Sequence, residues 1–144
     1  MKSIVIINGP NLNLLGSRQP EIYGNQTFES YFEQLKGVFP EIELVYFQSN
    51  HEGELVSTIQ DANTKHDGIV LNAAAYTHTS VAIADAVSAI QAPVIEVHIS
   101  YPEMREDYRK TSLLSDKCAG TISGLGLVGY QFAIEVLIDA RSKI

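Results

Sequence analysis

The feature that most constrains the fold of this chain is an alternation of short strand-like runs with segments of helical spacing. The first run consists mostly of β-branched residues without polar alternation, which is typical of a strand buried on both faces of a parallel sheet. The five runs are Ser3–Ile7, Ile42–Gln48, Ile69–Leu71, Val94–His98 and Gly120–Ser123. Strict alternation of such strands with helices predicts right-handed crossovers and a parallel sheet covered on both faces.

The segments between these runs carry the signals of helices. Thr27 is placed to cap the first helix, and Pro40 ends it. Glu54–Lys65 places its apolar residues on one face, and a third helix is expected to start near Ser80. The last helix is expected to be amphipathic and to run through Phe132, Val136, Leu137 and Asp139.

Length and alternation together predict one domain over residues 1–144. A chain of 144 residues with 45% hydrophobic content can bury roughly 70% of its unfolded surface without disulfides. Five strands in this length favour an α/β, flavodoxin-like three-layer sandwich with a five-stranded parallel sheet in the order 2-1-3-4-5. In that order ligands bind in the crevice between the carboxyl ends of the first and third strands.

Polar residues cluster where the predicted strands end. The first and third strands bring residues with amide and imidazole side chains to the crevice, and the fourth strand adds further polar residues to the same rim. These residues are Asn8, Asn11, Asn72, His78, Glu96, His98 and Ser100. The crevice is therefore the predicted functional site.

The segment Asn8–Gly24 is a long loop that carries Arg18 and Tyr23 but little that would pack. A loop of this length inside a compact domain is typically functional or disordered, and we interpret it as a lid. Arg105 and Arg109 lie in a second polar loop at the same end of the sheet.

Composition excludes several classes of partner. A net charge of −7 argues against nucleic acid, although local positive charge can still bind a small anion. No stretch approaches the ~20 apolar residues of a membrane span, and the four apolar residues before Asn8 are too few for a signal peptide core. We expect a cytoplasmic protein in which Cys118 is an inert thiol.

Two motifs are given structural rather than ligand-binding interpretations. Gly124–Gly129 matches G-x-G-x-x-G, but a dinucleotide site also needs a later strand ending in Asp or Glu about 20 residues on, and only a helix follows. We expect these glycines to allow close packing of that helix. His78 and His98 lack His or Cys partners at ligand spacing, so no metal site is predicted.

Taken together and in order, these residues resemble the type II 3-dehydroquinate dehydratases over nearly the whole chain. The matching stretches are Asn8–Gly16 with Arg18, Tyr23 and Gly24, Gln48–Asn50 with Glu52 and Gly53, Thr77–Ala82, Glu96–Ser100 with Arg105, Glu106 and Arg109, and Gly124–Gly126 with Gly129 and Tyr130. Two departures are visible. Ala73-Ala74 replaces a common Pro-Gly, and Tyr101 replaces a common Asn.

The resemblance implies a trans elimination of water from 3-dehydroquinate to 3-dehydroshikimate through an enolate, with no metal and no other cofactor. It makes Tyr23 the base that removes the C2 proton and Arg18 the lid residue that activates it, with Arg109 as a second cation. A free tyrosine with a pKa of ~10 is about 0.1% ionised at pH 7, and a contacting arginine can lower that pKa by ~1–3 units.

The resemblance also assigns the remaining groups. Asn72 would hold a water at the developing C3 oxyanion, since a reaction without a metal needs a preorganised donor there. His98 would protonate the departing C1 hydroxyl, with Glu96 orienting its imidazole and Asn11 bonding the same hydroxyl. Backbone N–H groups would receive the substrate carboxylate, and three side chains, one of them from a neighbouring subunit, would receive the ring hydroxyls. These residues are Ile99 and Ser100 for the carboxylate, and His78, Arg109 and the neighbour's Asp85 for the hydroxyls.

The usual assembly of the family is a homododecamer, a tetramer of trimers. Whether the reaction serves aromatic amino acid biosynthesis or quinate breakdown stays open at this point. Two other classes also stay open: a flavin- or nucleotide-binding module on the same fold, and a catalytically silent assembly protein.

Overall fold

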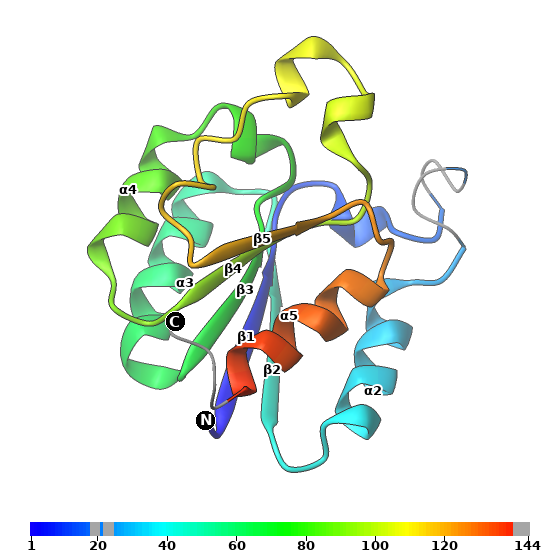
Figure 1. Ribbon diagram of the computed structural model, residues 1–144, viewed down its shortest axis with the longest axis vertical. Helices are drawn as coiled ribbons and strands as arrows, with labels where there is room; N and C mark the ends of the chain where they lie inside the picture. The colour runs from blue at the N-terminus through cyan, green and yellow to red at the C-terminus, as the bar shows by residue number, and fades with distance from the viewer. Residues whose placement is uncertain (18–20, 22–24, 140–144) are drawn as a thin grey trace.

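The computed structural model describes residues 1–17, 21 and 25–139. Within these residues the strands form one five-stranded parallel sheet in the order β2-β1-β3-β4-β5, which confirms the predicted fold (Figure 1). The strands are β1 (Ser3–Asn8), β2 (Glu43–Gln48), β3 (Gly68–Asn72), β4 (Val94–His98) and β5 (Gly120–Ser123). The register pairs Asn8 at the end of β1 with Asn72 at the end of β3. The crevice predicted at these two strand ends is therefore present.

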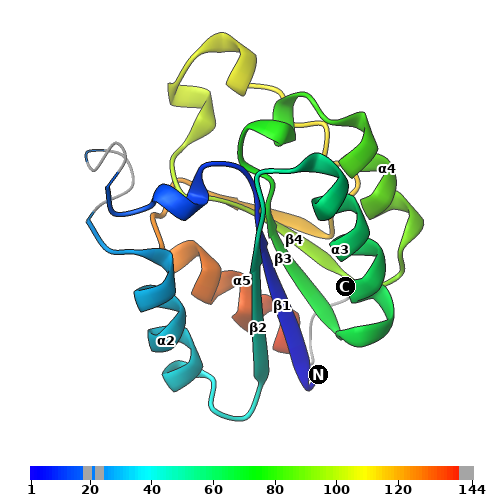
Figure 2. The ribbon, with the colours of Figure 1, turned by 180° about the vertical axis from the view of Figure 1, so that it is seen from behind.

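Helices cover both faces of the sheet and complete the three layers. They are α2 (Phe28–Val38), α3 (Glu52–Lys65), α4 (Val81–Ala89) and α5 (Val128–Ile138). Figures 1 and 2 show α2 and α5 against one face and α3 and α4 against the other. None of the helices in the described ranges combines the length and the apolar character needed to cross a membrane.

Alternate residues of the central strand feed two separate cores. Ile4 and Ile6 of β1 pack in the cluster under α2 and α5, whereas Val5 and Ile7 pack in the cluster under α3 and α4. All four are at most 2% exposed, and full burial of each such side chain stabilises the fold by ~1.5–3 kcal/mol. The absence of polar alternation in this run thus reflects a strand with helices on both sides.

The predicted helix starts carry side-chain caps. Thr27 Oγ1 accepts a hydrogen bond from the Ser30 N–H at 3.2 Å and begins α2. Ser80 Oγ accepts from the Ile83 N–H at 2.9 Å and begins α4. Each bond satisfies a backbone donor that the first helical turn leaves without an internal partner.

The expectation that α5 is amphipathic was wrong, because apolar residues lie on its exposed side as well as on its buried side. Phe132 and Val136 are about 40% exposed. The buried side of the helix, which covers the sheet, carries Tyr130, Ala133, Ile134 and Leu137. Nearly every residue of α5 is apolar, so the sequence pattern did not reveal which face is buried. Gly129 is also buried, and a β-carbon there would be in ordinary contact with Ile122 Cγ2 at 3.4 Å.

The prediction that the loop after β1 carries little that packs was also wrong for its first part. A 3₁₀ turn over Leu12–Leu14 directs Leu12 and Leu15 inward, and both belong to the core under α2 and α5. Two leucines in an otherwise polar loop give no periodic signal, so only the tertiary structure shows that they are buried.

Candidate active site

The loops after β1, β3 and β4 enclose a polar cavity at the carboxyl edge of the sheet. Most of the predicted site residues line it, although they come from three separate parts of the chain. The predicted residues in its wall are Asn11, Asn72, His78, His98, Ile99, Ser100 and Arg109. Arg105 also lines the cavity. The topology therefore brings together what the sequence analysis placed at one rim.

Among the described residues, Asn8, Glu96 and Asp85 of the predicted set are not in this wall. Glu96 lies behind His98, fully buried. Asp85 is exposed on α4 and does not line the cavity of its own chain. Arg18 and Tyr23 fall outside the described residues, so the predicted base and its lid arginine are not placed by the structure.

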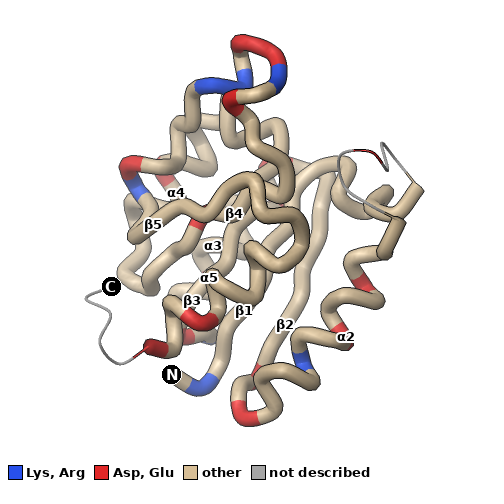
Figure 3. The backbone as a smooth tube through the Cα atoms, turned by 45° about the vertical axis from the view of Figure 1, so that its right-hand side comes forward, with Lys and Arg blue, Asp and Glu red and all other residues tan. Residues whose placement is uncertain are grey.

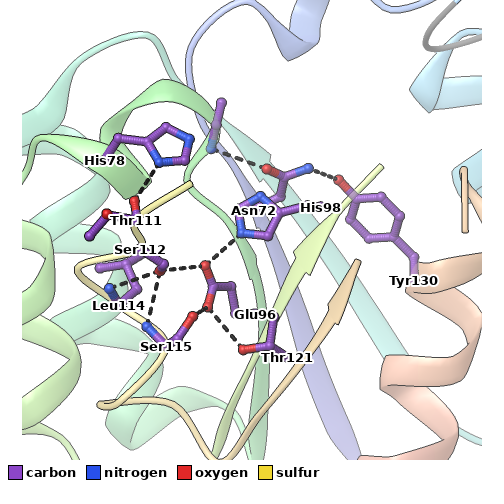
Figure 4. A network of polar contacts seen from close by, with 11 residues as sticks. Asn72, His78, Glu96, His98, Thr111, Ser112, Leu114, Ser115, Thr121 and Tyr130 are labelled. Carbon is purple, nitrogen blue, oxygen red and sulfur yellow. Dashed lines mark hydrogen bonds and ion pairs between the residues drawn. The ribbon is translucent and has the colours of Figure 1, made fainter. Parts of the chain in front are cut away.

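The buried carboxylate of Glu96 makes short contacts with His98 and with hydroxyl groups around it. Nε2 of His98 lies 2.6 Å from Oε2 of Glu96, which also accepts a hydrogen bond from Ser112 at 2.9 Å (Figure 4). The other oxygen, Oε1, accepts from Ser115 at 2.6 Å and from Thr121 at 3.0 Å. Both oxygens of a fully buried carboxylate are thus satisfied by three hydroxyls and one imidazole.

These contacts keep Glu96 ionised. Burial opposes the charge, but the hydrogen bonds from His98, Ser115 and Ser112 and the attraction to His98 outweigh it and lower the pKa of Glu96 to about 2. An ionised carboxylate only accepts hydrogen bonds, so Nε2 of His98 carries a proton and donates it. Nδ1 is therefore the ring nitrogen of His98 that can give or take a proton.

In His78 the other ring nitrogen, Nδ1, carries the proton. Its Nδ1 lies 2.7 Å from the carbonyl oxygen of Thr111, and because a carbonyl only accepts, Nδ1 carries the proton. Burial lowers the pKa of His78, which favours the neutral ring. The neutral imidazole then offers Nε2 as an acceptor for a hydroxyl.

The cationic residues of the cavity are held on the segment after β4. The side chains of Arg105 and Arg109 are 16% and 17% exposed, and Arg109 Nε binds Glu106 Oε2 at 2.7 Å. The Arg109 guanidinium also lies over the ring of Tyr108, 5.1 Å from its centroid. Figure 3 shows basic and acidic residues interspersed on this segment. Two partly buried guanidinium groups can bind an anion even though the chain is acidic overall.

The glycines after β5 hold the loop after β4, which forms part of the cavity wall. Gly124 N–H donates to the carbonyls of His98 and Ser100, both at 3.1 Å, and Gly126 N–H donates to that of Ile99 at 3.0 Å. Both glycines have positive φ, 83° and 68°, a conformation that other residues rarely adopt. The G-x-G part of the motif therefore holds the loop after β4. Gly129 packs against Ile122 and Val97, but a β-carbon there would also fit in ordinary contact, at 3.4 and 3.6 Å.

Asn72 is the last residue of β3, and both the nitrogen and the oxygen of its side-chain amide are hydrogen-bonded. Its Nδ2 donates to the hydroxyl of Tyr130 at 2.8 Å, and its Oδ1 accepts from the Ala74 N–H at 3.1 Å (Figure 4). Ala74 has a left-handed φ of 54°. It stands at one of the two departures from the family pattern, where glycine is common and would adopt this φ without strain.

The other departure lies outside the cavity wall. Tyr101 is 48% exposed, and its hydroxyl donates to Glu103 Oε2 at 3.2 Å. A β-carbon added to Gly124 would lie 3.2 Å from the Cβ of Tyr101, so the Tyr101 side chain packs over the turn that follows β5.

Sequence reasoning missed the groups that support the site from behind. Tyr130 belonged to a recognised stretch but had no assigned role, and Ser112, Ser115 and Thr121 carried no signal, because serines and threonines in loops and edge strands are common. Within the described part of the chain, no three side chains of His, Cys, Asp or Glu are grouped so that they could hold a metal ion.

Comparison with known proteins gives consistent matches over almost the full chain. A family model described as "Dehydroquinase class II" matches residues 2–138. A 3-dehydroquinate dehydratase of Campylobacter hominis is 52% identical over 143 residues, which cover 98% of this chain and 92% of that protein. A 3-dehydroquinate dehydratase of Prochlorococcus marinus (strain MIT 9301) is 51% identical over 144 residues, covering 99% and 98%.

Solved structures agree with the sequence matches. The crystal structure of a type II dehydroquinase from Butyrivibrio crossotus superposes with a TM-score of 0.92 at 44% identity, covering 96% of this chain and 98% of that one. A type II dehydroquinase from Propionibacterium acnes gives a TM-score of 0.91 at 39% identity, covering 96% and 98%.

Proposed function

This chain belongs to the class II dehydroquinase family, and we propose that it eliminates water from 3-dehydroquinate to give 3-dehydroshikimate. The elimination is trans and passes through an enolate. Residues 1–144 act as one catalytic domain without a cofactor.

The observation that carries this proposal is the Glu96–His98 pair at the wall of the cavity. Departure of the C1 hydroxyl as water requires a proton, and His98 can deliver one from Nδ1 because its Nε2–H is held by Glu96 at 2.6 Å. Asn11, in the same wall, binds the same hydroxyl. Glu96 acts as the residue that orients and stabilises the imidazolium.

The opposite proton, on C2, is removed by Tyr23 in this proposal. Arg18 activates the tyrosine, and Arg109 is the second cation that favours its ionised form. Support for a cationic environment comes from Arg105 and Arg109, which line the cavity with most of their side-chain surface covered.

The enolate places negative charge on the C3 oxygen, and Asn72 stabilises it through a bound water. Asn72 Nδ2 has two hydrogens, of which one is used by Tyr130, so the other is left for the cavity that Asn72 lines. A donor aimed at the place where charge develops is worth about 10²–10³ in rate in other enzymes.

Substrate binding uses the rest of the wall. Backbone N–H groups of Ile99 and Ser100 receive the carboxylate, while His78 and Arg109 receive ring hydroxyls. Asp85 completes this set from a neighbouring subunit, since its own cavity does not include it.

We assign this chain to a homododecamer, a tetramer of trimers, in the cytoplasm. A row of exposed apolar residues along α5 and the turn before it supports association with other copies. These residues are Leu125, Val128, Phe132 and Val136. The product serves aromatic amino acid biosynthesis or quinate breakdown.

The test is direct. Purified protein is mixed with 3-dehydroquinate, and the ultraviolet absorbance of the conjugated enone product is followed, with His98→Ala as the matched control. Enone formation by the native protein and its loss in the variant support the proposal. A purified protein that is coloured by flavin, or that forms no enone, contradicts it.

A further inference from the structure

A directional chain of hydrogen bonds runs from the end of β3 to the end of β1 through the last helix. It starts at the Ala74 N–H, which can only donate, and therefore fixes Oδ1 of Asn72 as the acceptor. Nδ2 of Asn72 must then face Tyr130, and it donates to the tyrosine hydroxyl at 2.8 Å. The hydroxyl in turn donates to Oδ1 of Asn8 at 2.8 Å.

Each member of the chain is held in one role. Tyr130 is fully buried, and burial raises the pKa of its hydroxyl, so it keeps its proton and has no solvent to exchange partners with. Asn8 is also fully buried, and its Nδ2 lies 3.5 Å from the hydroxyl of Tyr46, which leaves Oδ1 for Tyr130. Tyr130 accepts from one asparagine and donates to the other.

We infer that Tyr130 is a positioning residue, which holds the amide plane of Asn72 so that the second Nδ2 hydrogen is presented to the cavity. This inference rests on the proposed role of Asn72 at the enolate oxygen. Without the tyrosine oxygen, a single bond from Ala74 retains the amide, and the plane can turn about that bond. The donor would still be present, but it would no longer be aligned with the developing charge.

The proposed effect is confined to the transition state, so it should appear in kcat rather than in KM. Tyr130→Phe removes one oxygen and keeps the ring, which packs against Phe28 with a centroid separation of 4.9 Å. We expect kcat for 3-dehydroquinate to fall about tenfold, below the loss of about 100-fold expected for Asn72→Ala, since the donor is misaligned rather than removed. KM should change less than about twofold.

The matched control is Tyr31→Phe. Tyr31 is a buried tyrosine of the same core, its ring lies 6.4 Å from that of Tyr130, and its hydroxyl is not part of this hydrogen-bond chain. We expect its kcat to match that of the native protein. Circular dichroism and thermal unfolding of each variant separate a loss of folded protein from a loss of rate.

The deciding measurement is the double variant. If Tyr130 acts through Asn72, adding Tyr130→Phe to Asn72→Ala should change kcat less than about twofold. An equal loss in both backgrounds, full activity of Tyr130→Phe, or a loss that appears only in KM would overturn the inference.

Asn8→Ala gives a second route if Tyr130→Phe does not fold, because it removes the acceptor that orients the hydroxyl. An unchanged kcat in that variant would also overturn it.

Failure of the proposed function looks different. In that case the native protein forms no enone, or Asn72→Ala retains full kcat, which would overturn the role of Asn72 and with it that of Tyr130. A slow Asn72→Ala beside a fully active Tyr130→Phe would overturn only the inference about Tyr130.

Discussion

A β-carbon placed on Gly9 would lie 2.5 Å from the carbonyl oxygen of Ala73, closer than two such atoms can approach. The two residues follow the adjacent strand ends that form the crevice, and Gly9 N–H donates to the Asn72 carbonyl at 2.8 Å. The backbones after β1 and β3 are therefore in contact, and the glycine is required for space at this point.

We expect Gly9→Ala to lower the free energy of unfolding by ~1–3 kcal/mol, because the clash is with backbone that cannot turn aside. Gly37→Ala in α2 is the control, since a β-carbon there meets nothing within 4 Å. That variant should raise stability by ~0.5–1 kcal/mol through helix propensity. Urea unfolding of both measures the difference, and equal stability of the two variants would contradict the close approach.

The lowered pKa of Glu96 predicts that the stability of the protein depends on pH. Its pKa is lowered from 4.5 to about 2 in the folded protein, so its ionised form stabilises the fold fully above about pH 4.5. This contribution is lost as the pH falls through 2, at about 1.4 kcal/mol per pKa unit. Native protein should therefore lose stability between pH 4.5 and 2 more steeply than Glu96→Gln.

The control for this measurement is Glu41→Gln, which removes an exposed carboxylate. Its unfolding free energy should follow that of the native protein over the same pH range. A Glu96→Gln curve parallel to the native one would show that Glu96 is not ionised at low pH in the folded state.

Tyr23→Phe should abolish turnover and leave the fold intact, because it removes the proposed base and only one oxygen. Tyr101→Phe is the matched control, since it removes an exposed hydroxyl outside the cavity wall and should retain activity. Steady-state rates with 3-dehydroquinate decide it. A loss of less than about tenfold in Tyr23→Phe, ~1.4 kcal/mol in activation free energy, is too small for removal of the base.

Borohydride added with substrate should neither inactivate the protein nor change its mass. Among the described residues the wall of the cavity contains no lysine, and the neighbouring Lys110 is paired with Asp107 at 3.0 Å. Mass spectrometry of the treated protein checks this, with protein treated in the absence of substrate as the control. A substrate-dependent adduct would mean that the reaction proceeds through an imine.

The proposed sharing of sites between subunits predicts complementation. Asp85→Ala should weaken substrate binding, and Tyr23→Phe should be inactive, but their mixture should regain part of the native activity after subunit exchange. A mixed interface then combines an intact Tyr23 with an intact Asp85. No recovery after verified exchange, or full activity of a monomer shown by sedimentation, would mean that each chain carries a complete site.

The sequence by itself determined the sheet and the ends of its strands. Ser3–Ile7 has no polar face, and such a strand can be buried only with helices on both sides, which leads to the parallel order that is observed. Because parallel strands end at one edge, Asn72 and His98 could be placed at the same rim. The contact between Glu96 and His98, which the resemblance implied, fits their spacing along β4, since residues two apart share a face.

Only the tertiary structure decided which groups support that rim from behind. Tyr130 is 58 residues from Asn72 in the chain, and it reaches Asn72 because α5 is buried on the face that holds Tyr130. Apolar residues lie on both the buried and the exposed side of this helix, including the exposed Phe132 and Val136, so the sequence pattern did not reveal which face is buried. Glu96 is a second case, because its carboxylate accepts hydrogen bonds from Ser112, Ser115 and Thr121. Hydroxyl contacts of this kind depend on how loops pack in three dimensions, and they leave no periodic pattern in the sequence.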